Sequence, residues 1–250
     1  LSQTVALPGQ RMQPAGAGNP YVVGFPSLAG DGSAFGTNMT GYVMLKHVQI
    51  DYTGDYISEY KGSTPAIQFR YADVLLNYAE ALAEKNGAAN AGKIIEILHP
   101  LRERAGMPDI DFDREYNTSA EYPFRNLDKY IQAVRRERRV EKALEGRRVF
   151  DIMRWAAAEE LIIGNRAHGA LFIGSNLPEQ YGPELKYDQA SGNNMFLTGS
   201  PDDAERYILP VPPSTMPNGW QFKPNLDYLL PIQERMINVM DGMWEQNPGW

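Results

Sequence analysis

The sequence predicts a mainly α fold, built of helical hairpins with long irregular loops and a few short β strands. Two observations support this prediction. Residues 68–104 and 128–161 are rich in good helix formers, and their apolar residues recur every three or four positions. Residues 1–65 and 164–227 instead carry glycine, proline, serine and asparagine every few positions, with little helical period.

We expect three segments of one domain. Residues 1–65 form a loop-rich segment that packs on the helical core, residues 66–163 form a helical hairpin and a long helix, and residues 164–250 form a loop-rich C-terminal region. Short strands are expected at 21–23 and 42–50. A bare connection as long as the first segment is unusual inside a domain, so we expect it to be an ordered functional loop or to pack on a partner.

The first helix is expected from Gln68 to Lys85, where Asn86-Gly87 ends it. The residues that fall on its apolar face are Tyr71, Leu75, Tyr78, Ala79 and Leu82. A second helix should begin near Asn90 and be ended or kinked by Pro100. Its inward residues are expected to be Ile94, Ile95 and Leu98.

Small residues at Ala79, Ala81 and Ala91 allow these two helices to approach closely. Such a pair is similar to a tetratricopeptide unit, in which each hairpin buries one face only by stacking on its neighbours. A stable stack needs about three units. Because the chain offers one clear unit, we expect apolar surface at 71–82 and 144–153 that requires further cover.

The stretch from Asp128 to Leu161 is expected to form one long helix, because it has no proline and a single glycine. One stripe at steps of three and four is apolar at both ends and charged in the middle: Ile131, Val134, Arg138, Glu141, Glu145, Arg148, Ile152 and Trp155. The spacing suggests the ion pairs Arg138–Glu141, Glu145–Arg148 and Arg147–Asp151.

Two interpretations of this stripe remain open. In the first, the stripe faces solvent and the burying face is Val140, Leu144, Phe150 and Met153. In the second, the stripe faces another helix and forms a partly buried ion network. A catalytic role is the third and least favoured interpretation, because paired charges on long helices are usually structural.

Composition and spacing exclude several classes of site. The net charge of −7 argues against a nucleic-acid partner, and the absence of cysteine leaves no thiolate nucleophile, thiolate metal ligand or disulfide. The three histidines are scattered at 47, 99 and 168. The alternating acids of 109–113 lack the glycine and glutamate of a calcium loop, so a solvated acidic turn is expected. We expect no catalytic residue, metal or cofactor, although the many acids leave a glycosidase pair possible.

Aromatic residues punctuate the loops of 164–227: Phe172, Tyr181, Tyr187, Phe196, Tyr207, Trp220 and Phe222. Most should fill the interior of a region that otherwise lacks a core. Flat rings next to asparagine, aspartate and glutamine also suit sugars, which offer an apolar face and a hydroxyl edge. Trp220 follows the turn-forming pair Asn218-Gly219, which favours its projection into solvent.

We therefore select Trp220 as the first candidate ligand contact, with Tyr181 and Phe196 as second choices. The polar neighbours that would bond hydroxyl groups are Asn193, Asn194 and Gln221. The alternative, that Trp220 is a buried packing residue, stays open.

Four ordered segments resemble one known family. The charged stretch fits the pattern ER..E…EG.R..D..RW, with Glu137-Arg138 first and Arg154-Trp155 last. The other segments are TGYVMLKH at 40–47, FRYADVLLNYAEAL with LRERAGMPD at 69–109, and the ending YLLPIQ…QNPGW at 228–250. This order is similar to the C-terminal half of SusD/RagB proteins, with the departure that Gln233 stands where the family usually has proline.

The resemblance implies a non-enzymatic, cell-surface protein of the bacterial outer membrane that takes part in nutrient uptake and polysaccharide utilization. Such a protein captures a glycan and delivers it to a TonB-dependent SusC-like transporter. It also implies an N-terminal half with further helical repeats, and a lipoprotein anchor on an N-terminal cysteine that this sequence does not contain. A peptide ligand, or a helical-repeat scaffold that binds only protein, is the alternative, and a glycoside hydrolase is third.

Overall fold

The structure is a computed structural model, and it describes residues 4–12, 21–26, 38–46, 67–181 and 185–250. The fold is mainly α with a few short strands, as predicted. Contacts group the chain into two compact units, Thr64–Trp155 and Leu1–Ser63 with Ala156–Trp250. The expected three segments, 1–65, 66–163 and 164–250, remain a prediction.

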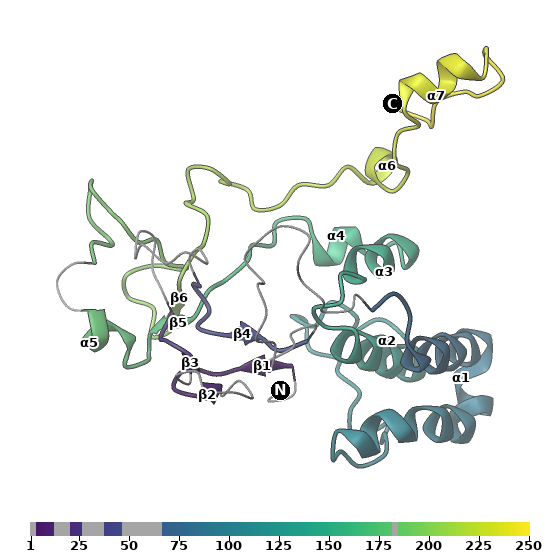
Figure 1. Cartoon of the computed structure of the whole chain (residues 1–250), viewed down its shortest axis with the longest axis horizontal. Helices are drawn as coiled ribbons and strands as arrows, with labels where there is room; N and C mark the ends of the chain where they lie inside the picture. The colour runs from purple at the N-terminus through teal and green to yellow at the C-terminus, as the bar shows by residue number, and fades with distance from the viewer. Residues whose placement is uncertain (1–3, 13–20, 27–37, 47–66, 182–184) are drawn as a thin grey trace. The chain divides into compact units, whose positions relative to one another are not determined.

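The unit Thr64–Trp155 contains α1 (Tyr71–Arg104), α2 (Lys129–Glu141) and α3 (Arg148–Arg154). The predicted hairpin is confirmed, because α1 is interrupted at Asn86, whose φ of −174° and ψ of 89° are not helical. The side-chain Oδ1 of Asn86 accepts a hydrogen bond of 3.0 Å from the Ala89 amide, which starts the second arm. The two arms lie side by side at the right of Figure 1 and share one core. The second arm reaches Arg104, with Pro100 inside the helix and not at its end.

The hairpin core is built from small residues of the first arm and larger ones of the second. Its members are Ala72, Leu76, Ala79, Ala83, Ile94, Ile97, Leu98 and Leu101, with Ile110, Phe112, Ala133 and Val134 from the following chain. The predicted inward face of the first arm was wrong in part, because Tyr71 and Tyr78 are 74% and 49% exposed. Alanines lie where the helices approach most closely, and the two tyrosine rings are too large for that contact.

Helix α2 packs on this hairpin at a point where only glycine fits. A Cβ atom on Gly87 would lie 2.5 Å from the Cβ of Tyr130. Asp128 caps α2, because its carboxylate accepts a 2.9 Å hydrogen bond from the Tyr130 amide.

The expected continuous helix from 128 to 161 is wrong. It is divided into α2, α3 and a short α4 (Ala158–Leu161). The chain adopts positive φ at Leu144, Gly146 and Ala156, with values of 64°, 69° and 48°. Gly146 enters this region without steric cost, and helix propensity alone did not reveal that the neighbouring residues would follow it. Val140, Leu144 and Phe150, once candidates for a burying face, are exposed.

The second unit contains three two-stranded antiparallel sheets. β1 (Val5–Ala6) pairs with β4 (Val43–Met44), β2 (Arg11–Met12) with β3 (Tyr21–Val22), and β5 (Leu171–Ile173) with β6 (Arg206–Tyr207). Strands at 21–23 and 42–50 were expected and are confirmed in part; residues 47–50 lie outside the described residues. The last sheet and α5 (Leu177–Tyr181) enclose a core of Phe172, Leu177, Met195, Leu197 and Ile208.

The C-terminal residues form α6 (Pro224–Asp227) and α7 (Glu234–Val239), neither of which has a buried residue. Side chains of the final QNPGW sequence hold this segment instead. The Gln246 amide group exchanges two hydrogen bonds of 2.8 Å with the backbone of Ile232, and Trp250 Nε1 donates to the Leu229 carbonyl at 2.7 Å. None of the described helices is both long and apolar enough to cross a membrane.

The contact between Gly87 and Tyr130 yields a direct test. Gly87→Ala should lower the free energy of unfolding by about 1–3 kcal/mol, because the added methyl group forces α2 away from the hairpin. Gly92→Ala is the matched control on the same helix, since nothing lies within 4 Å of its Cβ position. That change should raise stability by about 0.5–1 kcal/mol. Urea denaturation of both variants gives the comparison, and equal effects would contradict the close approach.

Candidate functional site

The charged residues of α2 and α3 face α1, so the second interpretation of the stripe is confirmed. Arg138 donates to Asp151 at 2.7 Å and to the Asn77 side chain on α1 at 2.8 Å. Lys142, with 5% of its side chain exposed, pairs with Asp73 of α1 at 2.5 Å and with Glu145 at 2.7 Å. This is a buried network that joins separate helices.

Arginines from α1 and from the residue before it complete the network. Arg70 pairs with Glu141 at 2.7 Å and with Glu145 at 2.5 Å, and Arg104 also reaches Glu141 at 2.6 Å. Arg102, which is buried, pairs with Glu137. The carboxylates of Glu137, Glu141 and Glu145 therefore bind arginines of α1 and Arg70 just before it. These contacts join separate helices, which indicates a structural role.

The three ion pairs expected along one helix were wrong. Arg138 pairs with Asp151 instead of Glu141, and Arg147 donates to the backbone carbonyl of Gln68. Arg148 lies over the rings of Trp155 and Phe124, with its Cζ atom 5.5 and 6.0 Å from their centroids. Glu145 and Arg148 lie on either side of Gly146, whose φ is positive, so helical spacing does not hold for that pair, and Arg138 finds its partner on α3.

Glu80 joins α1 to the end of α3. Its carboxylate accepts two hydrogen bonds from Arg154, of 2.6 and 2.9 Å, and one of 2.6 Å from Trp155 Nε1. Burial acts to raise the pKa of Glu80, but the hydrogen bonds from Arg154 and Trp155 outweigh it, and the pKa lies below its ordinary value of 4.5. These contacts therefore stabilise the anionic form of the Glu80 carboxyl group.

A different arrangement surrounds Trp220, the first candidate ligand contact. Residues 216–219 form a tight turn with proline in its second position, closed by a 3.2 Å hydrogen bond from the Gly219 amide to the Met216 carbonyl. The turn is fixed to the chain after α4, since Trp220 exchanges backbone hydrogen bonds of 2.9 Å with Gly164 and Asn165. Gly219 has a φ of 68°, and a Cβ atom there would lie 2.4 Å from the Gly164 carbonyl oxygen.

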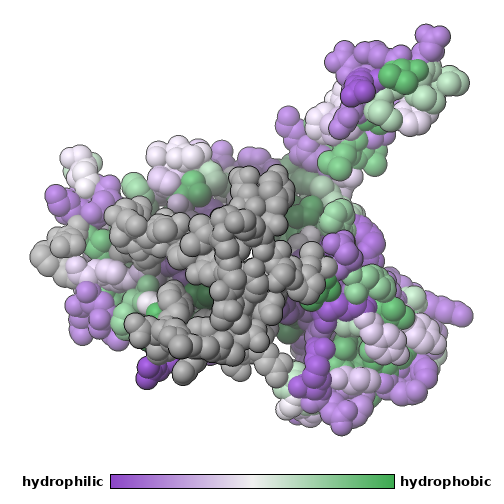
Figure 2. All heavy atoms as spheres, viewed as in Figure 1, coloured by the Kyte–Doolittle hydropathy of each residue, from purple (hydrophilic) through white to green (hydrophobic). Residues whose placement is uncertain are grey.

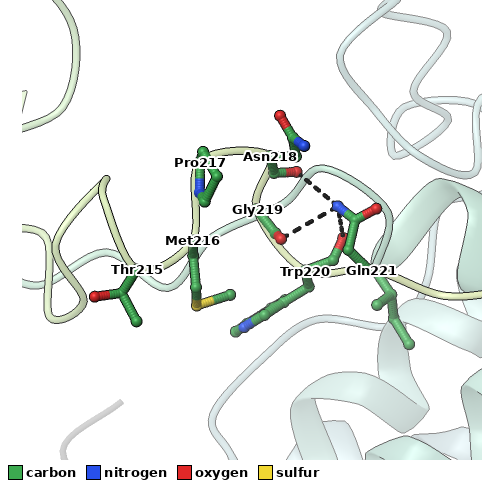
Figure 3. Close-up of a pocket in the computed structure, with 8 residues that line it drawn as sticks. Thr215, Met216, Pro217, Asn218, Gly219, Trp220 and Gln221 are labelled. Carbon is green, nitrogen blue, oxygen red and sulfur yellow. Dashed lines mark hydrogen bonds between the residues drawn. The ribbon is translucent and has the colours of Figure 1, made fainter.

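This turn forms one wall of a hollow of about 560 Å³ (Figure 3). Its lining consists of Ile162 and the residues 215–221. In Figure 3 the side chains of Met216 and Trp220 leave the turn on one side, while that of Asn218 points to the other. Trp220 is 42% exposed, so part of its ring is open to solvent.

Gln221, the polar neighbour selected from the sequence, lines the same hollow. Its Nε2 atom points back at the turn and lies 3.0 Å from the Asn218 carbonyl oxygen and 3.3 Å from that of Gly219 (Figure 3). The amide nitrogen thus stabilises the turn. Its oxygen is the atom of this side chain that is open to another donor.

The other four candidate residues lie in a separate part of the same unit. Tyr181 packs against the core around Phe172, and its hydroxyl donates to the Pro26 carbonyl. Asn193 and Asn194 brace one loop, because Asn193 bonds the Gln189 backbone and Asn194 Oδ1 accepts from the Lys186 amide at 2.7 Å. Phe196 is half-buried. None of these four lines the hollow beside Trp220.

Sequence reasoning missed Ile162, Thr215 and Met216, which complete this hollow. Thr215 and Met216 belong to the same turn as Trp220, so the Pro-Asn-Gly signal could have included them, whereas Ile162 is brought in only by tertiary pairing. Within the described residues, no group of three or more His, Asp or Glu side chains could hold a metal ion. The acids of 109–113 make ordinary contacts; Asp113, for example, pairs with Lys129.

Comparisons with known proteins identify one family. Its profile, described as the SusD family, matches residues 1–250. A curated relative, the SusD-like protein P25 of Formosa agariphila, is 32% identical over 110 residues, which are 43% of this chain and 18% of the relative.

Two solved structures share the fold. A SusD-like protein from Bacteroides fragilis superposes with a TM-score of 0.61 at 20% identity, over 99% of this chain and 38% of its own. The protein BT4246 superposes with a TM-score of 0.60 at 23% identity, over 99% of this chain and 35% of its own. The chain thus spans less than two fifths of the length of each of these relatives.

The Glu80 contacts predict a specific dependence of stability on pH. A carboxylate whose pKa is depressed by folding contributes stability above its unfolded pKa and loses it as the pH falls through the folded value. The difference in unfolding free energy between the wild type and Glu80→Gln should therefore be largest near neutral pH and narrow below pH 4.5. Glu103→Gln, an exposed change on the same helix, is the control. A Glu80→Gln difference that is constant from pH 7 to pH 3 would contradict the assignment.

Proposed function

The chain belongs to the SusD family, whose members are nutrient-binding proteins, and from this premise we propose that it binds a glycan at the bacterial cell surface. The observation that carries the proposal is the half-exposed ring of Trp220 at the hollow formed by Ile162 and residues 215–221. We call this hollow the Trp220 pocket.

The chemistry of the Trp220 pocket suits a sugar ring. Trp220, Met216 and Ile162 offer an apolar surface on which the C–H face of a pyranose can lie. Thr215, Asn218 and Gln221 supply polar groups at its edge. A volume of about 560 Å³ falls in the range of pockets that hold small ligands.

The wall that presents Trp220 is held in place before any ligand arrives. The turn is fixed by two backbone hydrogen bonds to residues 164–165 and by the hydrogen bonds of the Gln221 side-chain amide. The close approach of Gly219 to the Gly164 carbonyl also holds it in place. A fixed aromatic surface loses little conformational entropy on binding, which favours affinity from a small contact area.

Tyr181, Phe196, Asn193 and Asn194 are proposed as a second contact region on the loops around β5 and β6. The Asn193 and Asn194 side chains already bond the loop backbone, so their contribution would be to hold the loop in a binding conformation. Phe196, half-buried, would supply the apolar contact there.

We further propose the cellular role that the family suggests. The protein would be lipid-anchored to the outer membrane, exposed at the cell surface, and would deliver its glycan to a TonB-dependent SusC-like transporter. This role would require an N-terminal cysteine and an N-terminal half, and the chain spans 38% and 35% of the length of the two solved relatives. We infer a binding role without catalysis, consistent with the family's nutrient-binding proteins.

Replacement of Trp220 tests the binding site. Trp220→Ala should weaken glycan affinity by about 1–3 kcal/mol, as loss of a central aromatic contact does, and leave the melting temperature nearly unchanged. Trp244→Ala is the matched control, because Trp244 is also 42% exposed but lies outside the Trp220 pocket. A stability loss of about 3–5 kcal/mol in Trp220→Ala would instead show a packing residue.

A glycan panel tests the class of function. The protein is incubated with neutral and acidic oligosaccharides and with peptides, and affinity and products are measured together. Affinity for an oligosaccharide without new reducing ends supports the proposal. Release of products would establish an enzyme, and affinity for peptides alone would favour the peptide-binding alternative.

A further inference from the structure

A second pocket, in the unit Thr64–Trp155, is lined by positive charge. It has a volume of about 310 Å³ and lies between the end of α2 and the start of α3. Its charged lining residues are Arg138, Arg139, Lys142, Arg148 and Asp151. We call it the arginine pocket. Four cations and one carboxylate on one small surface are unexpected in a chain whose net charge is −7.

Two of the four cations are already neutralised. Arg138 pairs with Asp151 at 2.7 Å, and Lys142 pairs with Asp73 at 2.5 Å and Glu145 at 2.7 Å. The single carboxylate of the lining is therefore engaged by Arg138, and it also accepts from Arg154 at 3.1 Å. Arg139 and Arg148 receive no ion pair from the described residues.

Arg148 is the clearest unsatisfied group. Its Nη1 atom is buried and has no hydrogen-bond partner among the described residues. The guanidinium lies against the rings of Trp155 and Phe124, at 5.5 and 6.0 Å from the two centroids. Burial, and then the nearby charge of Arg139, lower the pKa of Arg148. A buried guanidinium with an unmade hydrogen bond costs free energy that a bound anion would recover.

Arg139 is the other arginine of the site. It is exposed, it lines the same pocket, and its charge is close enough to act on Arg148. Two guanidinium groups, one against aromatic rings and one exposed, offer planar donors that suit the oxygens of a carboxylate or a sulfate.

We propose that the arginine pocket binds an oxyanion carried on a sugar, so that the glycan recognised by this protein is acidic. The inference rests on the proposed glycan-binding function and names its substrate class. The shared chemistry is a carboxylate or sulfate group; a uronic acid supplies the first and a sulfated sugar the second.

The test is calorimetric titration of the full chain with glucuronate, glucose 6-sulfate and glucose, in a buffer without phosphate or sulfate. Glucuronate, the sulfated sugar, or both should bind with an affinity that falls as salt is raised, whereas any binding of glucose, through the Trp220 pocket, should not depend on salt. Arg139→Ala should weaken anion binding at least about tenfold, the equivalent of one charge-assisted hydrogen bond. Arg148→Lys keeps the charge but loses the planar donor pair, and should also weaken it.

Arg114→Ala is the matched control, because Arg114 is an exposed arginine of the same unit that does not line the pocket. Equal affinity of the wild type and Arg139→Ala for both charged sugars would overturn the inference, as would an equal loss in Arg114→Ala. Inorganic sulfate that binds while neither charged sugar does would also overturn it. If neutral glycans bind through Trp220 while glucuronate and glucose 6-sulfate do not bind, the arginine pocket inference fails and the proposed function stands.

Discussion

A buried ion network between α1 and the chain of α2 and α3 is the constraint on which the helical unit depends. Asp73 and Glu80 on α1 lie opposite Lys142 and Arg154, and each pair is made of hydrogen-bonded charges with little exposed carboxylate. Such pairs add little net stability over apolar packing, but loss of the cation leaves a buried carboxylate without its partner charge. The network therefore fixes which helix faces meet, while the core around Leu76 and Leu98 supplies most of the free energy.

The same network explains which parts of the fold the sequence could predict. The hairpin was predictable because its break at Asn86-Gly87 is local, and local signals do not depend on distant partners. The division of the charged stretch into α2, α3 and α4 was not predictable. Good helix formers surround Gly146, and only the pairing of Lys142 with Asp73 on α1 and of Glu145 with Arg70, just before α1, accounts for a chain that turns there. The sequence also placed Tyr71 and Tyr78 on the inward face of α1, where they do not lie. The space between the packed helices admits alanine side chains but not these rings, and that space is set by tertiary packing.

The candidate site shows the same division between local and tertiary information. Trp220 stands after a Pro-Asn-Gly turn, and its placement at a hollow follows from that turn together with the pairing to 164–165. Tyr181 has an equally suitable ring, but its hydroxyl bonds Pro26, a residue far away in the sequence. Arg148 was expected to pair with Glu145; its unsatisfied guanidinium became visible only when Arg70 and Lys142 were seen to take that carboxylate. The spacing of charged residues in the sequence indicates which ion pairs can form, and the tertiary structure determines which of them do form.

A double-mutant cycle on Asp73 and Lys142, whose side chains are 8% and 5% exposed, tests this account most directly. Unfolding free energies are measured by urea denaturation for the wild type, Asp73→Asn, Lys142→Met and the double variant. Lys142→Met should lower stability by about 3 kcal/mol or more, because it leaves the buried carboxylate of Asp73 without its cation. Asp73→Asn should cost less, because Lys142 keeps its pair with Glu145. The double variant should lose less than the sum of the two, by about 1–3 kcal/mol. Losses that add to within about 0.5 kcal/mol would show that the two charges are not coupled, and would contradict the network as the constraint that joins these helices.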